Sequence, residues 1–384
     1  MEIIGIDVGF GFTKAYNGTN SVIFKSIMGD ATEIQFNPLI GKETSASNLH
    51  ITMDDKSYFI GNFAELQSSI REFTLDQDKL LSDFVKFLAI TAAGVCCDET
   101  VPLKVVSGLP VGFLKRDYKK FTKAITGHHK ITFHNQNGKD VTKTININKI
   151  HIIPQPIGSI FNLIFDDYGK ISNRELSMQK LGVVDIGFRT TDFSIFDHLK
   201  YIERSSTTMD TGISKCFSVI ANKLREESGV NVELYRMFNF IEKGMIKIRG
   251  KEYNISNLTK RVFTHAASAI ATDLNRLWED DWDIDSIILS GGGSMALAEY
   301  LQTQIQGNII PIANNTDARL NNVHGYLKFG RYKWGYREPA TSPPATSVND
   351  NSDTNDTDKE ETEAKAEAEN DNQKSSKGLA WLKR

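Results

Sequence analysis

The chain has 384 residues, of which 40% are hydrophobic and 10% aromatic, and its 45 Lys and Arg against 48 Asp and Glu give a formal net charge of −3. This length allows two domains with a well-buried core, and the composition excludes a small scaffold that depends on disulfides. The near-neutral charge gives no indication of nucleic-acid binding, and the lack of a signal-peptide pattern or a run of about 18 apolar residues predicts a cytoplasmic protein outside the membrane.

The first 165 residues alternate between strand patterns and helical patterns. The opening 26 residues predict a three-stranded meander, with Asn17-Gly18 as a hairpin turn. Apolar residues at helical spacing predict a core helix over 78–93, and a second helix is expected over 154–165 with Pro156 in its first turn. The expected strands cover 2–8, 12–16, 21–25, 49–53, 56–60, 103–109 and parts of 128–152.

The same order of strands and helices recurs after residue 181 and ends in a buried strand over 284–290. Identity between the two halves is confined to one short pattern, in which an aspartate and a glycine follow an apolar run. Its two copies are Ile6-Asp7-Val8-Gly9-Phe10-Gly11-Phe12-Thr13-Lys14 and Val184-Asp185-Ile186-Gly187-Phe188-Arg189-Thr190-Thr191-Asp192. The recurrence indicates a structural duplication into two related lobes.

Each copy has the residue types that a nucleotide phosphate site requires. Because a carboxylate is repelled by phosphates, Asp7 and Asp185 are expected to hold Mg²⁺ through its water molecules. Glycines let backbone N–H groups approach the phosphates, and a lysine adds a positive charge near the β-phosphate. The expected ligand contacts are Gly9, Gly11, Phe12, Thr13 and Lys14 in the first copy, and Gly187, Thr190 and Thr191 on the γ-phosphate side in the second.

Asp192, at the end of the second copy, is open between a role at the ligand and a role as a turn cap. A third candidate element is a buried strand that runs into Ser290-Gly291-Gly292-Gly293-Ser294 and then into a helix. Such a loop packs flat against an adenine ring or places N–H groups near the α-phosphate. We therefore expect nucleotide contacts from Gly291, Gly292, Gly293 and Ser294.

In this order and spacing, the three motifs resemble the phosphate-1, phosphate-2 and adenosine motifs of the actin, sugar-kinase and heat-shock-chaperone ATPase superfamily. The likeness extends over residues 1 to about 335 and includes two connecting segments, Ile152-Ile153-Pro154-Gln155-Pro156-Ile157-Gly158-Ser159 and Asn321-Asn322-Val323-His324-Gly325-Tyr326-Leu327. Within the superfamily, the chain is most similar to prokaryotic actin-like proteins of the ParM/StbA kind and to their archaeal relatives. Ser107-Gly108-Leu109-Pro110 is a further string that supports this likeness.

The resemblance implies an α/β fold of the actin-like type, with ribonuclease H-like duplicated lobes around a cleft for ATP and Mg²⁺. Lobe I is expected over residues 1–152 and lobe II over 153–337, with the C-terminal part of lobe II returning to lobe I. By the same likeness, Gln155 orients the attacking water and is catalytic together with Asp7 and Asp185. Gly212 is implied near the phosphates and Lys215 near the ribose or the base.

The second hairpin departs from many members of that superfamily. They have a second small residue where this chain has Phe188-Arg189. Three roles for Arg189 are open: a contact to the γ-phosphate, an ion pair with Asp192, or a contact to a neighbouring subunit.

The composition changes abruptly near residue 338. Residues 341–374 contain no aromatic residue and no Ile, Leu or Met, so the segment 338–384 is predicted to be a disordered acidic tail. Its last residues form a short apolar and basic tip that contains Leu379, Trp381 and Leu382. Three interpretations of the tip remain: a terminal coil, a partner-binding peptide or a membrane contact.

The favoured function is that of an ATPase that polymerises into cytoskeletal filaments, as the resemblance implies, for segregating plasmid DNA or positioning another cargo. Direct nucleic-acid binding is not expected, because no basic stripe is interleaved with aromatic residues, so an adaptor protein would carry the DNA contact. The alternatives are a non-filamentous ATP-binding scaffold of the FtsA or pilus-assembly type at a membrane, and a small-metabolite kinase. Cys96, Cys97 and Cys216 lack metal-ligand spacing and are expected to be buried, reduced thiols.

Overall fold

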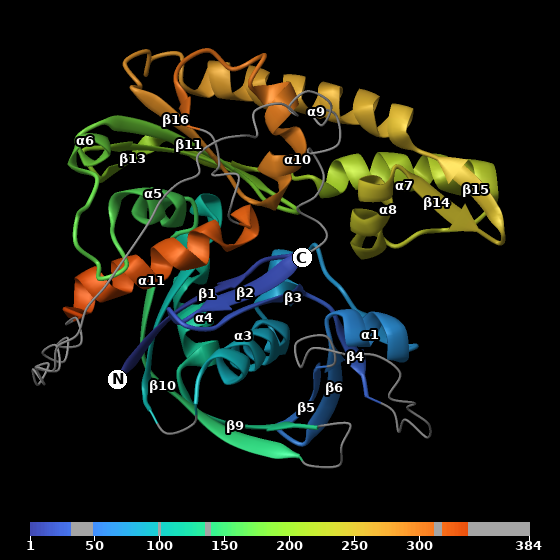
Figure 1. Ribbon diagram of the computed structural model, residues 1–384, viewed down its shortest axis with the longest axis horizontal. Helices are drawn as coiled ribbons and strands as arrows, with labels where there is room; N and C mark the ends of the chain where they lie inside the picture. The colour runs from blue at the N-terminus through green and yellow to red at the C-terminus, as the bar shows by residue number, and fades with distance from the viewer. Residues whose placement is uncertain (32–48, 99–100, 135–139, 311–316, 337–384) are drawn as a thin grey trace, which may run out of the picture.

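Two mixed sheets, one from each half of the chain, form the framework of the computed structural model, which describes residues 1–31, 49–98, 101–134, 140–310 and 317–336 (Figure 1). The first sheet has ten strands in the order β3-β2-β1-β8-β10-β9-β5-β6-β4-β7, and the second has five in the order β13-β12-β11-β16-β17. A separate hairpin, β14–β15, projects from the second half. The predicted acidic tail and its tip lie outside the described residues.

The strands of the first sheet correspond closely to those expected from the sequence. They are β1 (Glu2–Val8), β2 (Phe12–Tyr16), β3 (Ser21–Lys25), β4 (Met28–Asp30), β5 (Leu49–Met53), β6 (Lys56–Ile60), β7 (Arg71–Glu72), β8 (Leu103–Leu109), β9 (Gly127–Phe133) and β10 (Val141–Pro154). Those of the second half are β11 (Lys180–Ile186), β12 (Thr191–Asp197), β13 (Lys200–Met209), β14 (Met245–Ile248), β15 (Lys251–Asn254), β16 (Ser286–Ser290) and β17 (Ile309–Ile310).

The two sheets share one topology, which confirms the predicted duplication. In the first, β1 pairs antiparallel with β2 and β2 with β3, while β1, β8 and β10 run parallel. In the second, β11 pairs antiparallel with β12 and β12 with β13, while β11, β16 and β17 run parallel. Because the carboxyl ends of parallel strands meet at one edge of a sheet, β1 and β11 deliver equivalent residues to equivalent places.

The helices cover the faces of the two sheets and fill the space between them. In the first half they are α1 (Asn62–Gln67), α2 (Gln77–Leu80), α3 (Asp83–Cys96), a 3-10 turn (Val111–Phe113), α4 (Leu114–Ile125), α5 (Ile157–Ile164) and α6 (Arg174–Ser177). In the second half they are α7 (Ser214–Ser228), a 3-10 turn (Leu234–Arg236), α8 (Met237–Lys243), α9 (Ser256–Leu277), α10 (Gly292–Leu301), a 3-10 turn (Ala318–Leu320) and α11 (Asn321–Trp334). None of these helices has both the length and the apolar character that crossing a membrane requires.

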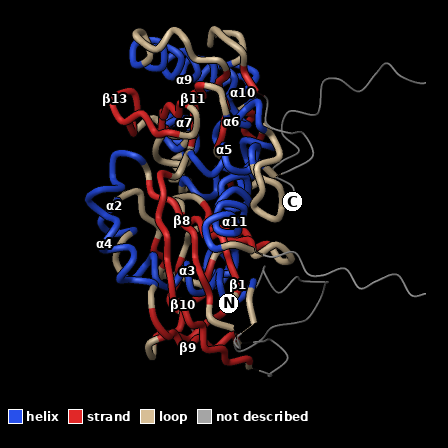
Figure 2. The backbone as a smooth tube through the Cα atoms, turned by 90° about the vertical axis from the view of Figure 1, so that its left-hand side faces the viewer, coloured by secondary structure: helices blue, strands red, loops and turns tan. Residues whose placement is uncertain are grey.

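Helices α5 and α11 cross between the two sheets, as the views in Figures 1 and 2 show. Glycines allow the crossing, because a Cβ atom built at Gly325 would lie 1.7 Å from the Gly158 carbonyl oxygen, and one at Gly5 would lie 2.4 Å from the Val323 carbonyl oxygen. Helix α11 therefore packs directly on β1 and β8 of the first sheet. The last helix in the described part of the chain is thus part of the support beneath the first Asp-Gly hairpin.

Two helical predictions are corrected by the structure. The helix expected over 78–93 is two helices, because the Ser82 hydroxyl accepts a hydrogen bond from the Phe84 N–H and starts α3 after a break. The helix expected from residue 154 begins at Ile157, since Pro154 is still the last residue of β10. Both changes shorten helices and leave Gln155 in the connection between β10 and α5.

Candidate functional site

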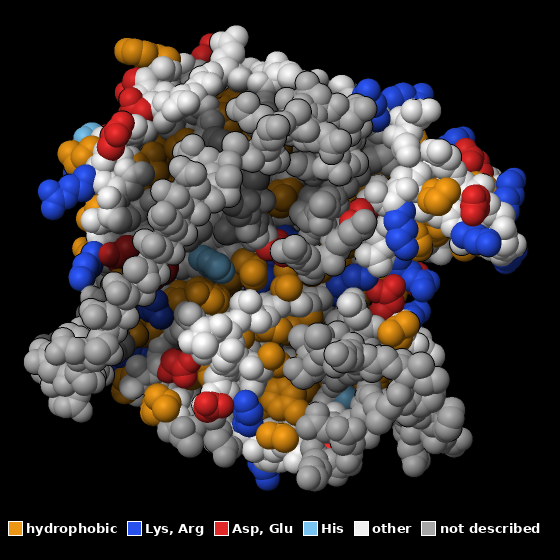
Figure 3. All heavy atoms as spheres, viewed as in Figure 1, with side chains coloured by type: hydrophobic (Ala, Val, Ile, Leu, Met, Phe, Trp, Pro, Cys, Tyr) orange, Lys and Arg blue, Asp and Glu red, His pale blue; other side chains and the backbone are white. Residues whose placement is uncertain are grey.

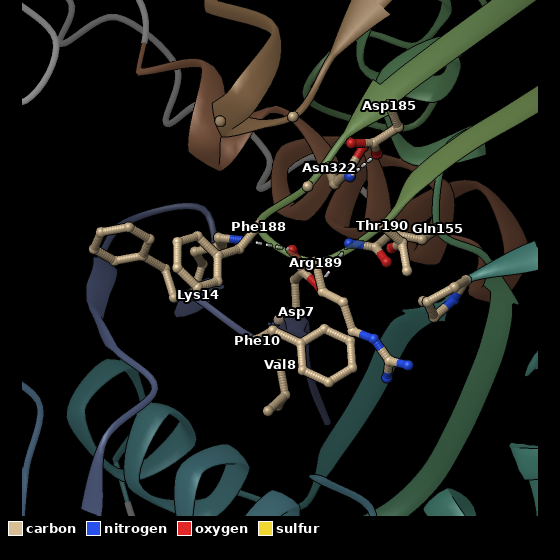
Figure 4. A pocket seen from close by; sticks show the side chains of 18 of the residues that line it. Asp7, Val8, Phe10, Lys14, Gln155, Asp185, Phe188, Arg189, Thr190 and Asn322 are labelled. Carbon is tan, nitrogen blue, oxygen red and sulfur yellow. Dashed lines mark hydrogen bonds and ion pairs between the residues drawn. The ribbon is translucent and has the colours of Figure 1, made fainter. Parts of the chain in front are cut away.

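The two Asp-Gly hairpins meet at one pocket, which lies between the sheets (Figure 4). Each hairpin closes in the same way: the Gly9 N–H donates to the Phe12 carbonyl at 3.1 Å, and the Gly187 N–H donates to the Thr190 carbonyl at 2.8 Å. Asp7 and Asp185 occupy the next-to-last positions of β1 and β11, and both are buried. The pocket therefore has one buried carboxylate from each lobe.

Asp7 is held from two sides. The Lys14 ammonium lies 2.7 Å from Oδ2 of Asp7, and the Gln155 amide donates to Oδ1 at 3.3 Å. Gln155 is in turn fixed through its backbone, because its N–H donates to the Leu109 carbonyl and its carbonyl accepts from the Tyr326 hydroxyl. The first carboxylate, the lysine and the glutamine predicted from the sequence thus form one connected group.

Asp185 has a different partner. The position opposite Asp7 in the β1–β2 ladder is Lys14, whereas the position opposite Asp185 in the β11–β12 ladder is Asp192. The Asn322 amide instead donates to Oδ2 of Asp185 at 2.8 Å. Burial raises the pKa of Asp185 to about 6, because no cation forms an ion pair with this carboxylate among the described residues. A cation bound in the pocket would remove that cost of burial.

The glycine-rich loop closes the pocket on the side of the second sheet. Gly291 has φ 83°, and a Cβ atom there would lie 2.3 Å from Oδ1 of Asp185. A Cβ atom at Gly293 would lie 2.6 Å from Cγ2 of Ile186. Glycine is therefore required for the N-terminus of α10 to approach β11, and N–H groups at the start of a helix suit an anion.

Aromatic side chains and two arginines line the remaining wall. Arg189 lies over the ring of Phe10 at 5.1 Å, and Arg319 lies over the ring of Phe12 at the same distance. Phe12 also packs edge-on against Phe238, with ring centroids 4.9 Å apart. This wall joins the first hairpin to helix α8 of the second lobe.

Arg189 forms an ion pair with Asp210 at 3.6 Å, rather than with Asp192. Its Nη1 atom is buried and has no hydrogen-bond partner among the described residues. A guanidinium nitrogen without a partner in the described part of the chain, beside the two Asp-Gly hairpins, is a ready donor to an anionic group.

Of the catalytic residues and nucleotide contacts expected from the sequence, thirteen line this pocket and five do not. Those that line it are Asp7, Gly9, Gly11, Phe12, Lys14, Gln155, Asp185, Gly187, Arg189, Thr190, Gly291, Gly292 and Gly293. The other five are Thr13, Thr191, Gly212, Lys215 and Ser294.

Each of these five has another position for a physical reason. The Thr191 hydroxyl donates to the Thr211 carbonyl at 3.1 Å. Thr13 faces away from the Lys14 side of β2, and its hydroxyl pairs with that of Ser26 at 3.0 Å. The Ser294 hydroxyl is turned back to the Ser290 carbonyl. Gly212 lets the backbone pack against Arg189, since a Cβ atom there would lie 2.3 Å from the Arg189 carbonyl carbon. Lys215 is exposed and pairs with Asp210 at 3.6 Å.

Several lining residues were not assigned a role from the sequence. Asn322 and Arg319 come from the segment around the start of α11, and Phe10, Phe188 and Phe238 supply the aromatic wall. Asn322 could have been identified from the sequence, because it is a polar residue within a segment that resembles one of the connecting segments of the superfamily. Nothing in the sequence indicated Phe238, because its place in the pocket depends on how α8 packs against the first hairpin.

Asp192 connects the two lobes outside the pocket. It is fully buried and accepts hydrogen bonds from the Val111 N–H of the first lobe, at 2.9 Å, and from the Thr208 hydroxyl. The Gly112 N–H donates to Thr208 at 2.7 Å beside it. This residue therefore ties the loop after β8 to the second sheet, which is more than the turn cap considered from the sequence.

Asp192→Asn is expected to change how stability depends on pH. Burial raises the pKa of Asp192 to about 7, so between about pH 4 and 7 the folded state binds more protons than the unfolded state, and the free energy of unfolding falls as pH rises. Asparagine keeps an acceptor for Val111 but has no charge. We expect the free energy of unfolding of the variant, minus that of the wild type, to increase by roughly 2–4 kcal/mol from pH 4.5 to pH 8, as measured by urea unfolding. Parallel stability curves for the two proteins would contradict this account of the carboxyl group.

No set of three or more His, Cys, Asp or Glu side chains in the described part of the chain is arranged to hold a metal ion alone. A Mg²⁺ ion at Asp7 and Asp185 would therefore need most of its ligands from phosphate oxygens and water, which is the usual coordination of this ion. The two buried carboxylates, the unpaired Arg189 nitrogen and the glycine loops fit a Mg-nucleotide better than a free metal.

Two family models match successive parts of the chain. The model described as the N-terminal domain of actin-like proteins matches residues 5–158, and the model described as the C-terminal part of the archaeal actin homologue MreB-like family matches residues 183–303. Together they include the two hairpins, Gln155 and the glycine-rich loop. No curated protein matches the sequence significantly.

Solved structures of prokaryotic actin homologues have the same fold. A ParM filament from Clostridium botulinum is 23% identical with a TM-score of 0.73, over 86% of this chain and 99% of that one. An archaeal actin homologue in complex with ADP is 20% identical with a TM-score of 0.68, over 86% and 99%. A Bacillus thuringiensis ParM with ADP is 18% identical with a TM-score of 0.66, over 87% and 99%.

Proposed function

Since this chain is a prokaryotic actin-like protein, with two matching actin-like domains and the fold of ParM and archaeal actin homologues, we propose that it binds and hydrolyses ATP with Mg²⁺ and assembles into filaments. The nucleotide would occupy the pocket between the two hairpins. Assembly would follow ATP binding, and hydrolysis would weaken the polymer.

One observation supports this proposal above the others: Asp7 and Asp185 reach one pocket from two equivalent hairpins, with Lys14 and Gln155 bonded to the first of them. Bound Mg²⁺ would neutralise charge on the phosphates. Lys14 contributes a second positive charge at the same point, and the N–H groups of both hairpin turns and of the α10 N-terminus are donors for phosphate oxygens. This set of groups serves phosphoryl chemistry, which needs positioning and charge stabilisation more than a covalent catalyst.

Gln155 is proposed to orient the attacking water. Its amide nitrogen donates to Asp7, so its amide oxygen is available to accept a hydrogen bond from water. The contacts to Leu109 and Tyr326 hold its backbone at the carboxyl ends of β8 and β10. A neutral amide also avoids the repulsion that a carboxylate would have with the γ-phosphate.

Arg189 is proposed to contact the γ-phosphate through the nitrogen that lacks a partner. The ion pair with Asp210 holds the other side of the guanidinium, so the side chain needs little rearrangement to reach the ligand. The base would lie at the α10 side of the pocket, between Gly292 and the aromatic wall. Arg319 is close to that position, since a Cβ atom at Gly292 would lie 3.3 Å from its Cγ.

Filament assembly is proposed from the kind of proteins that share the fold, one of which is described as a 15-stranded filament. Segregation of plasmid DNA through an adaptor protein remains the favoured role, with positioning of another cargo as the alternative. Direct contact with nucleic acid is not part of the proposal.

Light scattering and phosphate release, measured together, test the proposal. At micromolar protein, Mg-ATP should raise scattering while Mg-ADP and ATP with excess EDTA do not. Gln155→Ala should slow phosphate release by about 10²-fold, while polymer formed with ATP persists longer than that of the wild type. Phosphate release without any rise in scattering would exclude filaments, and nucleotide binding that is undetectable by calorimetry would exclude the whole proposal.

A further inference from the structure

Trp282 is the most exposed large hydrophobic side chain in the described part of the chain, at 87%. It lies in the loop Trp278-Glu279-Asp280-Asp281-Trp282-Asp283-Ile284-Asp285, which contains five carboxylates and no Lys or Arg. A tryptophan side chain exposed to water loses the large stabilisation that burying its apolar surface would give, and tryptophan is a common anchor at protein interfaces. We call Glu279, Asp280, Trp282 and Asp283 the acidic tip.

The acidic tip is held rigidly from beneath. The buried Trp278 indole donates to the Ser205 carbonyl at 2.9 Å, and the buried Asp281 carboxylate pairs with Lys180 at 2.9 Å and with Arg204 at 2.6 Å. Trp282 follows directly and is therefore presented by an ordered loop. No ion pair among the described residues involves Glu279 or Asp280. Rigid presentation reduces the entropy lost when such a side chain docks.

A surface of opposite charge lies on the β14–β15 hairpin. Lys247, Arg249 and Lys251 are exposed there against one acidic residue, Glu252, and Met245 adds an apolar side chain that is 43% exposed. Neither Lys247 nor Arg249 forms an ion pair within the part of the chain that the structure describes. We call Met245, Lys247, Arg249 and Lys251 the basic hairpin.

The two surfaces lie at opposite ends of one helix. The basic hairpin directly precedes α9 and the acidic tip directly follows it, and the 22 residues of α9 span about 33 Å. Figure 1 shows α9 running between these two ends, and Figure 3 shows acidic and hydrophobic side chains at the upper left and basic side chains at the right. The two surfaces therefore cannot meet within one molecule.

We propose that the acidic tip of one copy docks on the basic hairpin of the next, so that copies join head to tail along the second lobe. This inference deepens the proposed function, since it names the surfaces through which the chain would assemble. Contact between two different surfaces of one chain is heterologous, and repeating it builds an open polymer whenever the rotation between copies does not close a ring. Opposite charges fix the orientation, and Trp282 with Met245 supplies the apolar contact.

Charge reversal at each surface provides the test. The tip variant is Glu279→Lys with Asp280→Lys, and the hairpin variant is Lys247→Glu with Arg249→Glu. All four side chains are exposed and lie outside the nucleotide pocket, so folding and binding of a fluorescent ATP analogue should match the wild type. Each variant alone should need at least about 10-fold more protein than the wild type to form sedimentable polymer with Mg-ATP.

The decisive sample is the equimolar mixture of the two variants. Its acidic tips meet basic hairpins, and its reversed tips meet reversed hairpins, so assembly should return to within about 3-fold of the wild type. Trp282→Ala should impair assembly in the same way and should not be rescued by either charge variant.

A crosslinking experiment reads the same contact directly. The native Cys96, Cys97 and Cys216 are buried, and burial raises the pKa of Cys96 to about 12 and that of Cys216 to about 11, so they compete poorly for a thiol reagent. Asp283→Cys with Glu252→Cys, two exposed positions that leave Trp282 and Met245 in place, should therefore form a ladder of multimers with a short bismaleimide under assembly conditions. Asp283→Cys with Leu66→Cys, whose second site is an exposed residue of the first lobe, is the matched control and should not.

The outcomes separate this interface from the proposed function. If the wild type assembles and the two charge variants assemble equally well, or their mixture is not rescued, the interface is wrong and the filament proposal stands. If the wild type forms no polymer and the cysteine pair forms no ladder at any concentration tested, assembly is wrong and the interface falls with it.

Discussion

Asp185→Asn is expected to lower the rate of ATP hydrolysis by about 10³-fold without weakening the fold. Asp185 is one of two carboxylates that reach the pocket, and the amide of asparagine has no charge with which to hold Mg²⁺ and its waters. The change is nearly isosteric and its oxygen still accepts from Asn322. Phosphate release at saturating Mg-ATP measures the loss.

Although Asp185→Asn should lower activity, it should not lower the stability of the fold and is expected to raise it. Because burial raises the pKa of Asp185 to about 6, the ionised carboxylate opposes folding at neutral pH in the absence of ligand, and asparagine removes that cost. Thermal unfolding at pH 7.5 without nucleotide should therefore show an equal or higher Tm.

Asp192→Asn is the matched control, because it removes a buried carboxylate from the same hairpin at a position outside the pocket. Its hydrolysis rate should stay within about 10-fold of the wild type, since Asp192 does not line the pocket itself and reaches it through a long hydrogen bond, 3.5 Å, from the Thr190 hydroxyl. Full turnover in Asp185→Asn, or equal losses in both variants, would show that the metal role has been assigned to the wrong residue.

Gly325→Ala is expected to destabilise the protein by at least about 3 kcal/mol and to weaken nucleotide binding. The added Cβ atom would lie 1.7 Å from the Gly158 carbonyl oxygen, so the backbones of α5 and α11 must separate. The first turns of the two helices follow Gln155 and contain Asn322, and Tyr326 bonds to the Gln155 carbonyl. Separating the helices therefore moves groups around both carboxylates.

Urea unfolding and calorimetric titration with Mg-ADP measure these two effects. Gly335→Ala is a suitable comparison, because Gly335 has φ 66° and nothing lies within 4 Å of a Cβ atom there. That substitution alters only the backbone conformation at the C-terminus of α11 and should cost about 1 kcal/mol with no change in binding. Equal losses in the two variants would mean that the close crossing of α5 and α11 is not what Gly325 contributes.

Strand positions, the duplication and about half of the residues that line the pocket were predictable because they depend on short-range patterns. Apolar runs define β1 and β11. The aspartate and glycine at the end of each run lie at the carboxyl end of the strand, and therefore at the same edge of each sheet. Gln155 and the three glycines were found through their order along the chain and a resemblance. Breaks within helices were missed, since the Ser82 cap that divides α2 from α3 competes with a continuous apolar pattern.

Short sequence motifs determined which residues have side chains or backbone suited to binding phosphate. The packing of distant segments decided which of those residues face the pocket. Thr13 and Ser294 have suitable side chains, but strand alternation and a hydrogen bond to the preceding turn direct them elsewhere. The Asn322 contact to Asp185 joins residues 137 positions apart, and Asp192 reaches Val111 across 81 positions. Local patterning carries no information about such pairs, because they exist only once α11 crosses between the sheets and the second sheet closes on the loop after β8.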